Sequence, residues 1–291
     1  MSLLSKVLKI RRRESNHMTK SATQFVESGI KLNKEKKVKK DRRPLIISIT
    51  SVTLFLLLWE IASRNAWINP LFISSPIEIL QASVYMVQEA SFWDNLKVSG
   101  YEFLAGFALA ILVGIPIGVF SGWNKYFNAI VNPFISGLYV TPKVALLPVI
   151  VIAFGIGPAS KIVIVFLMAF FPIVMSAQKA MVTLDQNLIK AARTFNASEF
   201  QIFKTIALPS TVPFLLNGIR LGIGQGLIAV VVGELFASTA GIGYQLTSNG
   251  QNLQTDRMFV GVLIITITGL ILTFLLGLIE KRFSSWKPEH K

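Results

Sequence analysis

The chain has 291 residues, of which 52% are hydrophobic and 15% are charged, and its mean hydropathy is +0.58. This composition excludes an ordinary soluble domain and indicates a protein whose solvent is lipid. A net charge of +14 would suit a nucleic-acid-binding protein, but the apolar remainder of the chain argues against that class, and the absence of cysteine excludes disulfides, thiol catalysis and cysteine metal sites.

The N-terminal segment, residues 1–44, is strongly basic. Fourteen of the 29 Lys and Arg residues lie between Lys6 and Arg43. Because few apolar side chains remain there to be buried, we expect a disordered cytoplasmic arm. A polybasic segment directly before a membrane span is a topology signal that also attracts anionic lipid headgroups. No cleavable signal peptide is expected, because no apolar h-region with a small-residue cleavage site is present.

Six apolar segments are long enough to cross a hydrocarbon layer about 30 Å thick, which takes roughly 20 helical residues. Because only helices satisfy the backbone in lipid at these lengths, the predicted fold class is all-α, a polytopic membrane protein with six transmembrane helices. Residues 76–97 carry apolar side chains at helical spacing among polar ones, which predicts an amphipathic helix on the outer interface. The expected spans are about 45–62, 99–120, 127–154, 161–177, 212–236 and 258–279.

The positions of Lys and Arg predict the orientation of these spans. If the N-terminus is cytoplasmic, the inside segments carry 23 Lys and Arg residues and the outside segments carry 4. Both termini, including the tail 282–291, are therefore predicted to lie in the cytoplasm, with the chain in the cytoplasmic membrane.

Two spans carry glycines four residues apart. Such spacing lets helix backbones approach closely in lipid, where no hydrophobic effect drives helices together. The glycines serve packing alone, or packing in helices that also slide or tilt during transport. They are Gly114, Gly118 and Gly122 in the second span and Gly218, Gly222 and Gly226 in the fifth.

The longest cytoplasmic interruption between spans, within residues 179–209, has the pattern of two short helices. The first helix carries an apolar stripe at helical spacing and ends at Asn196, which tolerates the left-handed conformation of a helix C′ position. Ser198 and Gln201 match a capping box that opens the second helix, and Pro209 suits the first turn of the next span. The stripe consists of Leu188, Ala191, Ala192 and Phe195.

This loop resembles the EAA loop of the permease subunits of ATP-binding-cassette (ABC) importers. The similarity rests on residues 190–198 (Lys-Ala-Ala-Arg-Thr-Phe-Asn-Ala-Ser) and on 203–209 (Phe-Lys-Thr-Ile-Ala-Leu-Pro). Lys190 stands where the family usually has Glu, which reverses a charge, and Asn196 stands where it usually has Gly. Taken alone, the loop would equally suit a merely amphipathic helix beside the membrane.

The similarity extends over about 200 residues, from Ser75 to Arg282, and identifies the nitrate, sulfonate and taurine branch of these permeases. It implies the type I importer (MetI-like) permease fold with a core over residues 98–281. The matching motifs are Leu-Val-Gly-Ile-Pro-Ile-Gly at 112–118, Pro-Lys-Val-Ala-Leu-Leu-Pro at 142–148, Phe-Gly-Ile-Gly at 154–157, Phe-Phe-Pro-Ile at 170–173, Gly-Glu-Leu at 233–235 and Gly-Ile-Gly-Tyr at 241–244.

The resemblance implies the partners and the residues that couple them. The partners would be a second permease copy, two ATPase subunits that hold ATP and Mg²⁺, an extracytoplasmic solute-binding protein, and membrane lipid. No cofactor is expected on this chain, because no segment fits the P-loop pattern G-x-x-x-x-G-K-[ST]. The coupling loop, residues 184–209, would dock on the ATPase through Lys190, Ala191, Ala192, Phe195, Asn196, Ala197 and Ser198.

Polar residues and prolines inside spans are candidates for the solute pathway, because ionisable groups are costly there. Lys143 and Arg220 could contact an anion, or could pair inside the bundle or extend to an interface. Glu234 fits a structural or gating role better than solute contact, and Gln225 is a further pathway candidate. Pro142 breaks the third span, either to line a pore or only to kink the helix.

Two other classes compete with the importer. A secondary transporter or channel would show inverted repeats and buried carboxylates, and the sequence predicts neither. A membrane-embedded enzyme would need a cluster of histidine, cysteine or carboxylate groups within the spans, which is not expected either. The solute is expected to be a small anion such as nitrate, a sulfonate, taurine or bicarbonate.

Overall fold

The computed structural model describes residues 43–65, 67, 69 and 71–282, all of it helix, turn or loop. Residues 1–42 of the basic arm and 283–291 of the tail lie outside these residues. The chain divides after Leu57 into two units. The helices are α2 (Arg43–Arg64), α3 (Pro76–Gln88), α4 (Ala90–Trp123), α5 (Lys125–Val140), η1 (Lys143–Leu146), α6 (Leu147–Phe154), α7 (Pro158–Val182), α8 (Gln186–Thr194), α9 (Glu199–Ile202), η2 (Phe203–Ala207), α10 (Leu208–Phe236), α11 (Ile242–Gln251) and α12 (Thr255–Arg282).

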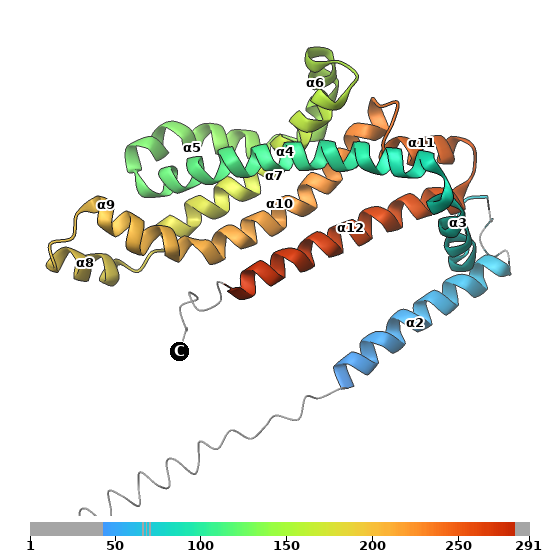
Figure 1. The fold of residues 1–291 in the computed structure, drawn as a ribbon, viewed down its shortest axis with the longest axis horizontal. Coiled ribbons are helices and arrows are strands. Elements are labelled where there is room, and N and C mark those ends of the chain that lie inside the picture. The colour runs from blue at the N-terminus through green and yellow to red at the C-terminus, as the bar shows by residue number, and fades with distance from the viewer. Residues whose placement is uncertain (1–42, 66, 68, 70, 283–291) are drawn as a thin grey trace, which may run out of the picture. The chain divides into compact units, whose positions relative to one another are not determined.

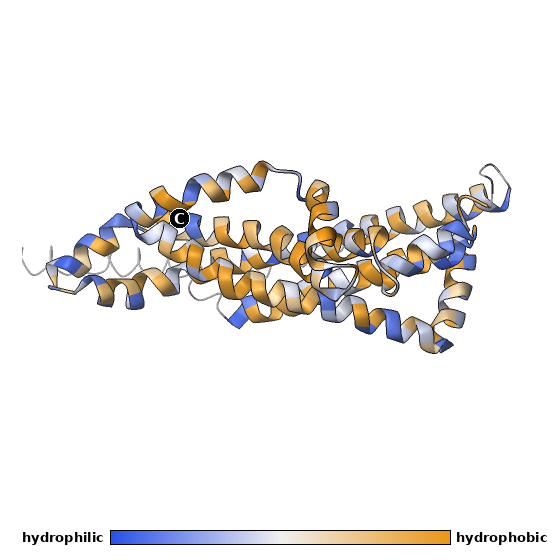
Figure 2. Cartoon of the chain, turned by 90° about the horizontal axis from the view of Figure 1, so that it is seen from above, coloured by the Kyte–Doolittle hydropathy of each residue, from blue (hydrophilic) through white to orange (hydrophobic). Residues whose placement is uncertain are grey.

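Five helices among the described residues are long and apolar enough to cross a membrane: α2, α4, α7, the helix running from α9 through α10, and α12. The bent pair of α5 with η1 and α6 gives a sixth if it is counted as one span. Apolar residues cover most of these helices, and polar residues gather at their ends (Figure 2). The predicted all-α, polytopic fold class is confirmed.

Helices α4, α7 and α10 form the centre of the unit that begins at Leu58, with α7 packed against both of the others (Figure 1). The main apolar core joins side chains from all three helices with α6 and α12, among them Phe103, Val165, Ile223 and Leu276. Helices α8 and α9 lie at one end of this bundle, and α3 and α11 lie at the other (Figure 1).

Both glycine series face α7, which confirms the predicted close packing. A Cβ added to Gly122 would lie 2.5 Å from the Met181 Cβ, and one added to Gly218 would lie 2.5 Å from the Ser176 Cβ. Neither distance is possible for real side chains. Small residues therefore set the separation between α7 and its two neighbours.

The third predicted span, 127–154, differs most from the structure. It forms two segments bent by 90° to one another. Pro133 lies inside α5 without breaking it, whereas Pro142 precedes η1 and cannot donate a backbone hydrogen bond to continue the helix. Pro148 lies in the first turn of α6, where proline is tolerated.

The expected interfacial helix, 76–97, also differs. It ends at Gln88, and residues from Ala90 onward belong to α4. Its start is fixed by a capping box, in which Ser75 accepts from the Glu78 N–H and the Glu78 carboxylate accepts from the Ser75 N–H. The other spans run a few residues beyond the predicted ranges, because the helices continue through polar residues that a hydropathy pattern leaves out.

Candidate functional site

Capping hydrogen bonds from neighbouring residues fix both ends of helix α8. The Asp185 side chain accepts a hydrogen bond from the Asn187 N–H at the start. At the end Asn196 has a φ of 59°. The Ala197 N–H donates to the Ala192 carbonyl at 3.1 Å and the Asn196 N–H to the Arg193 carbonyl at 2.9 Å, which is the Schellman pattern. The predicted left-handed closure at Asn196 is confirmed.

The second short helix, α9, begins one residue after this turn. Ser198 and Gln201 form the predicted capping box, with the Gln201 side chain accepting from the Ser198 N–H at 2.8 Å. Arg193 crosses the turn and donates to one oxygen of Glu199 at 2.8 Å and 3.1 Å. Helix α9 then passes through the π-helix η2 into α10 without interruption. The turn is thus held rigidly, and it is continuous with a membrane-spanning helix.

One face of α8 packs inward and another is left exposed. Ile189 is 8% exposed, and Ala192 and Ala197 pack beside it against residues of α4, α7 and η2 such as Val119, Ala177 and Ala207.

The rest of the predicted stripe points away from this cluster. Leu188 and Ala191 are exposed, and Phe195 is 87% exposed, with Phe200 of α9 also exposed. Of the four stripe residues, therefore, only Ala192 faces the bundle. The remaining candidates, Lys190 and Ser198, are exposed.

A cavity of about 490 Å³ brings together two of the predicted pathway residues, Lys143 and Gln225. The Lys143 ammonium donates to the Tyr139 carbonyl at 2.9 Å and lies 4.7 Å from the centre of the Phe171 ring. We call this space the Lys143 cavity. Its lining comes from α5, η1, α7 and α10, namely Tyr139, Lys143, Met168, Phe171, Pro172, Met175, Ser176, Leu221 and Gln225.

The other three predicted pathway residues do not line the Lys143 cavity. Arg220 pairs with Glu280 of α12, with 2.6 Å between Nη2 and Oε2, so it forms the bundle-internal pair that was one of its three interpretations. Pro142 lies directly before η1. Glu234 lies in a separate polar cluster near α11.

That cluster contains residues that the sequence analysis missed. Glu102 of α4, Lys161 of α7 and Glu234 of α10 are each 1% exposed. The expectation that the spans contain no buried carboxylates or carboxylate cluster is therefore wrong. A hydropathy average over a long window hides a single charged residue such as Glu102, and Lys161 stood at the first position of the expected span 161–177. The charge of Glu102 in an otherwise apolar span was the available signal.

Comparison with known proteins gives a consistent result. The family of binding-protein-dependent transport system inner membrane components matches residues 114–285. The taurine transport system permease protein TauC of Escherichia coli (strain K12) is 32% identical over 252 residues, which cover 85% of this chain and 92% of that protein. The putative aliphatic sulfonates transport permease protein SsuC of Bacillus subtilis (strain 168) is 26% identical over 238 residues, covering 82% and 86%.

Solved structures show the same fold. An inward facing conformation of the MetNI methionine ABC transporter, in its CY5 native crystal form, superposes with a TM-score of 0.51 at 17% identity, covering 74% of this chain and 100% of that chain. The similarity to these proteins spans more than half of the sequence and disfavours a secondary transporter or channel. The chain belongs to the family of binding-protein-dependent transport system inner membrane components, and it is a membrane-spanning permease subunit of an ABC importer.

Proposed function

We propose that this chain carries a small anion into the cytoplasm, driven by ATP that separate ATPase subunits hydrolyse. Relatives named for taurine and for aliphatic sulfonates support a sulfonate-type solute, with nitrate and bicarbonate as the other candidates. ATP and Mg²⁺ belong to two ATPase subunits, and this chain needs no cofactor or active site of its own. The remaining partners are a second permease copy, a solute-binding protein on the outer face, and membrane lipid.

The proposal that the coupling loop docks on an ATPase rests on the exposed face of α8. Leu188, Ala191 and Phe195 present apolar surface on a segment that lies beyond the core of the bundle. Exposed apolar patches of this kind mark interaction sites, and burial yields about 25 cal/mol per Å². Because Ala191 projects only a methyl group, a partner surface can approach the helix closely.

The charge of Lys190 indicates what that partner presents. Lys190 is exposed on α8 where the family usually has Glu. A cation at this position favours a carboxylate on the facing surface of the ATPase, and it disfavours the cation that would pair with Glu. The loop is therefore matched to its own ATPase by charge as well as by shape.

The loop also has the stiffness needed to pass on a motion. The turn at Asn196 and the capping box at Ser198 fix its shape, and its inward face packs on α4 and α7. When ATP closes the ATPase dimer, α8 and α9 move with it and tilt α10, which opens the pathway outward; hydrolysis reverses this. This cycle requires both termini to be cytoplasmic.

The Lys143 cavity is the proposed solute pathway within one subunit. Lys143 supplies a positive charge, and Gln225 and Ser176 supply hydrogen bonds, in a space large enough for a small organic anion. Aromatic and apolar walls leave the ammonium weakly hydrated, which strengthens its attraction for an anion.

Replacing Ala191 with Trp tests the docking directly. Ala191 is exposed, so the larger side chain is accommodated in the free permease but blocks close approach of a partner. The Ala191→Trp permease should fold and insert but should lose co-purification with its ATPase. Ala159→Trp, at an exposed alanine at the start of α7, is the matched control and should retain it. An intact complex with Ala191→Trp would refute the docking assignment.

A further inference from the structure

The polar cluster of Glu102, Lys161 and Glu234 has no part in the transport cycle described above. It lies at the α11 end of the bundle and contains three ionisable side chains from three helices. Burying a charge is costly unless it is paired and hydrogen-bonded. Each group in the cluster therefore needs a partner, and the hydrogen bonds identify those partners.

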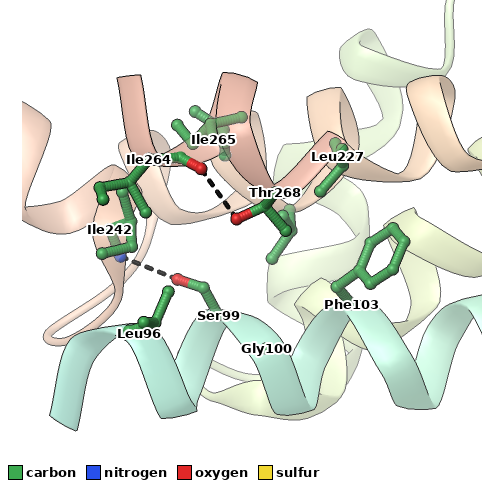
Figure 3. A pocket seen from close by; sticks show the side chains of 11 residues that line it. Leu96, Ser99, Gly100, Phe103, Leu227, Ile242, Ile264, Ile265 and Thr268 are labelled. Carbon is green, nitrogen blue, oxygen red and sulfur yellow. Dashed lines mark hydrogen bonds between the residues drawn. The ribbon is translucent and has the colours of Figure 1, made fainter. Parts of the chain in front are cut away.

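Glu234 has the hydrogen bonds of an ionised carboxylate. Its Oε1 accepts from the Ser99 hydroxyl at 2.6 Å, and its Oε2 accepts from the Gly243 N–H at 2.6 Å. The Ser99 oxygen in turn accepts from the Ile242 N–H at 2.8 Å (Figure 3). Both oxygens of Glu234 thus act as acceptors, and together with Ser99 they bind the turn that opens α11.

Lys161 supplies the opposite charge. Its ammonium donates to the Ala237 carbonyl at the end of α10 and interacts favourably with both Glu102 and Glu234. One ammonium balances one carboxylate. The second carboxyl group, that of Glu102, has no further cation beside it among the described residues that line this space.

Glu102 has no comparable set of hydrogen-bond donors, and its Oε2 is buried without a hydrogen-bond partner among the described residues. Two carboxylates in one buried cluster repel each other, so with a single ammonium beside them one of the two carries a proton. Because Glu234 already accepts from two donors, the proton belongs to Glu102.

Glu102 and Lys161 both line a cavity of about 170 Å³, which we call the Glu102 cavity. Its remaining walls come from the two connections that precede α7 and α11, including Gly157, Ser238 and Ala240. Water occupies about 30 Å³ per molecule in the liquid, so the space suffices for several molecules. An unsatisfied buried oxygen beside such a space indicates a ligand that donates a hydrogen bond.

We propose that the Glu102 cavity binds water, one molecule of which donates to Glu102 Oε2, and that Glu102 is a neutral carboxylic acid. Water both donates to Glu102 and accepts from the remaining N–H groups of Lys161. A metal cation would not, because the Lys161 ammonium repels it. The proton and the water then complete the hydrogen bonding that joins α4, α7 and α10 to the α10–α11 turn.

Infrared spectroscopy of the assembled transporter in lipid tests the protonation of Glu102. A protonated carboxyl group has a carbonyl band separate from those of amides and carboxylates. We expect such a band at neutral pH, a shift of it in D₂O because water reaches the group, and its loss in Glu102→Gln. Glu89→Gln, at a partly exposed carboxylate paired with Arg257, should leave the band unchanged. A spectrum of Glu102→Gln identical to that of the unmodified protein would overturn the proposal.

Thermal stability gives an independent test. Glutamine resembles a neutral carboxylic acid but cannot replace a carboxylate that accepts at both oxygens. Glu102→Gln should therefore keep a Tm close to that of the unmodified complex, whereas Glu234→Gln should lower it by several degrees. The reverse order would overturn the assignment. A Tm that rises with Na⁺ or K⁺ in the unmodified protein but not in Glu102→Gln would show a cation site in place of water.

Discussion

Asn196 determines how the coupling loop turns, because its φ of 59° is one that most side chains avoid. Asparagine tolerates this conformation and glycine adopts it freely, whereas a β-branched residue is strained there. Asn196→Gly should retain ATPase binding and transport. Asn196→Val should destabilise the turn by about 1–2 kcal/mol and weaken binding of the ATPase, measured by titrating the permease with the purified subunit. Equal binding by the two variants would contradict this role.

Lys143 is the residue through which the proposed anion preference can be tested. Loss of a hydrogen bond to a charged group costs about 1.5–3 kcal/mol, so Lys143→Gln should raise the KM for transport roughly 10- to 100-fold. Lys143→Arg should restore most of the affinity. Lys97→Gln removes an exposed lysine paired with Asp94 and serves as the control. Uptake in proteoliposomes with saturating binding protein is the measurement, and an unchanged KM in Lys143→Gln would exclude anion contact.

Local residue patterns could be predicted, and distant pairings could not. The closure at Asn196 and the Ser198 capping box depend on neighbours within five residues, so the sequence carries the whole signal. The Arg220–Glu280 pair and the Glu102 cluster join residues 59 or more positions apart. No short-range pattern specifies such contacts.

At the scale of the element, α7 is the central helix of the packing. It packs against α4 on one side and against α10 on the other, with glycines of both neighbours set against it. The glycine spacing predicted that these helices approach closely, but not which partner each one faces. The choice of partner depends on where all helices lie, and a pattern within one helix does not contain that information.

Two glycines of α10 allow the effect of packing on stability to be measured apart from the effect of helix propensity. Gly218 faces Ser176 of α7 at a distance that excludes a Cβ, whereas Gly224 has no atom within 4 Å of a Cβ position. Gly218→Ala should destabilise the permease by about 1–3 kcal/mol through overpacking. Gly224→Ala should be neutral or stabilise it by up to about 1 kcal/mol. Thermal unfolding of the two variants in the same detergent measures the difference, and equal Tm values would refute the close approach.

The broken third span shows where a pattern becomes ambiguous. Pro142 was expected to break the third span, and the segment around it bends by 90°, whereas Pro133 leaves α5 intact. In a helix, proline removes one hydrogen bond, and neighbouring helices decide whether the chain kinks or turns. The apolar pattern gave the total length of the segment but not its direction.

At the scale of the unit from Leu58 onward, the coupling loop and the Glu102 cluster occupy opposite ends of the same helices (Figure 1). Composition and hydropathy were enough to predict the membrane class and five or six membrane-spanning helices, because these follow from the thickness of a bilayer. The cytoplasmic side of the coupling loop stays a prediction from the positions of Lys and Arg. The arrangement of the bundle depends on long-range contacts and follows only from the structure.

The absence of cysteine makes the proposed orientation directly measurable. Phe195, directly after α8, and Tyr85 of α3 are both well exposed. In sealed right-side-out vesicles, a membrane-impermeant maleimide should label Tyr85→Cys and should label Phe195→Cys only after the vesicles are opened. Labelling of Phe195→Cys in intact vesicles would reverse the orientation and, with it, the side on which the ATPase binds.

The length of α4 has a consequence for the choice of lipid. Its 34 residues extend about 51 Å at 1.5 Å per residue, well beyond a hydrocarbon layer of about 30 Å. Its first turns are polar, with an exposed ion pair between Lys97 and Asp94, and the excess of the apolar remainder is relieved by tilting or by local deformation of the bilayer. Acyl-chain length should therefore alter the tilt of α4, and with it the turnover of the reconstituted transporter.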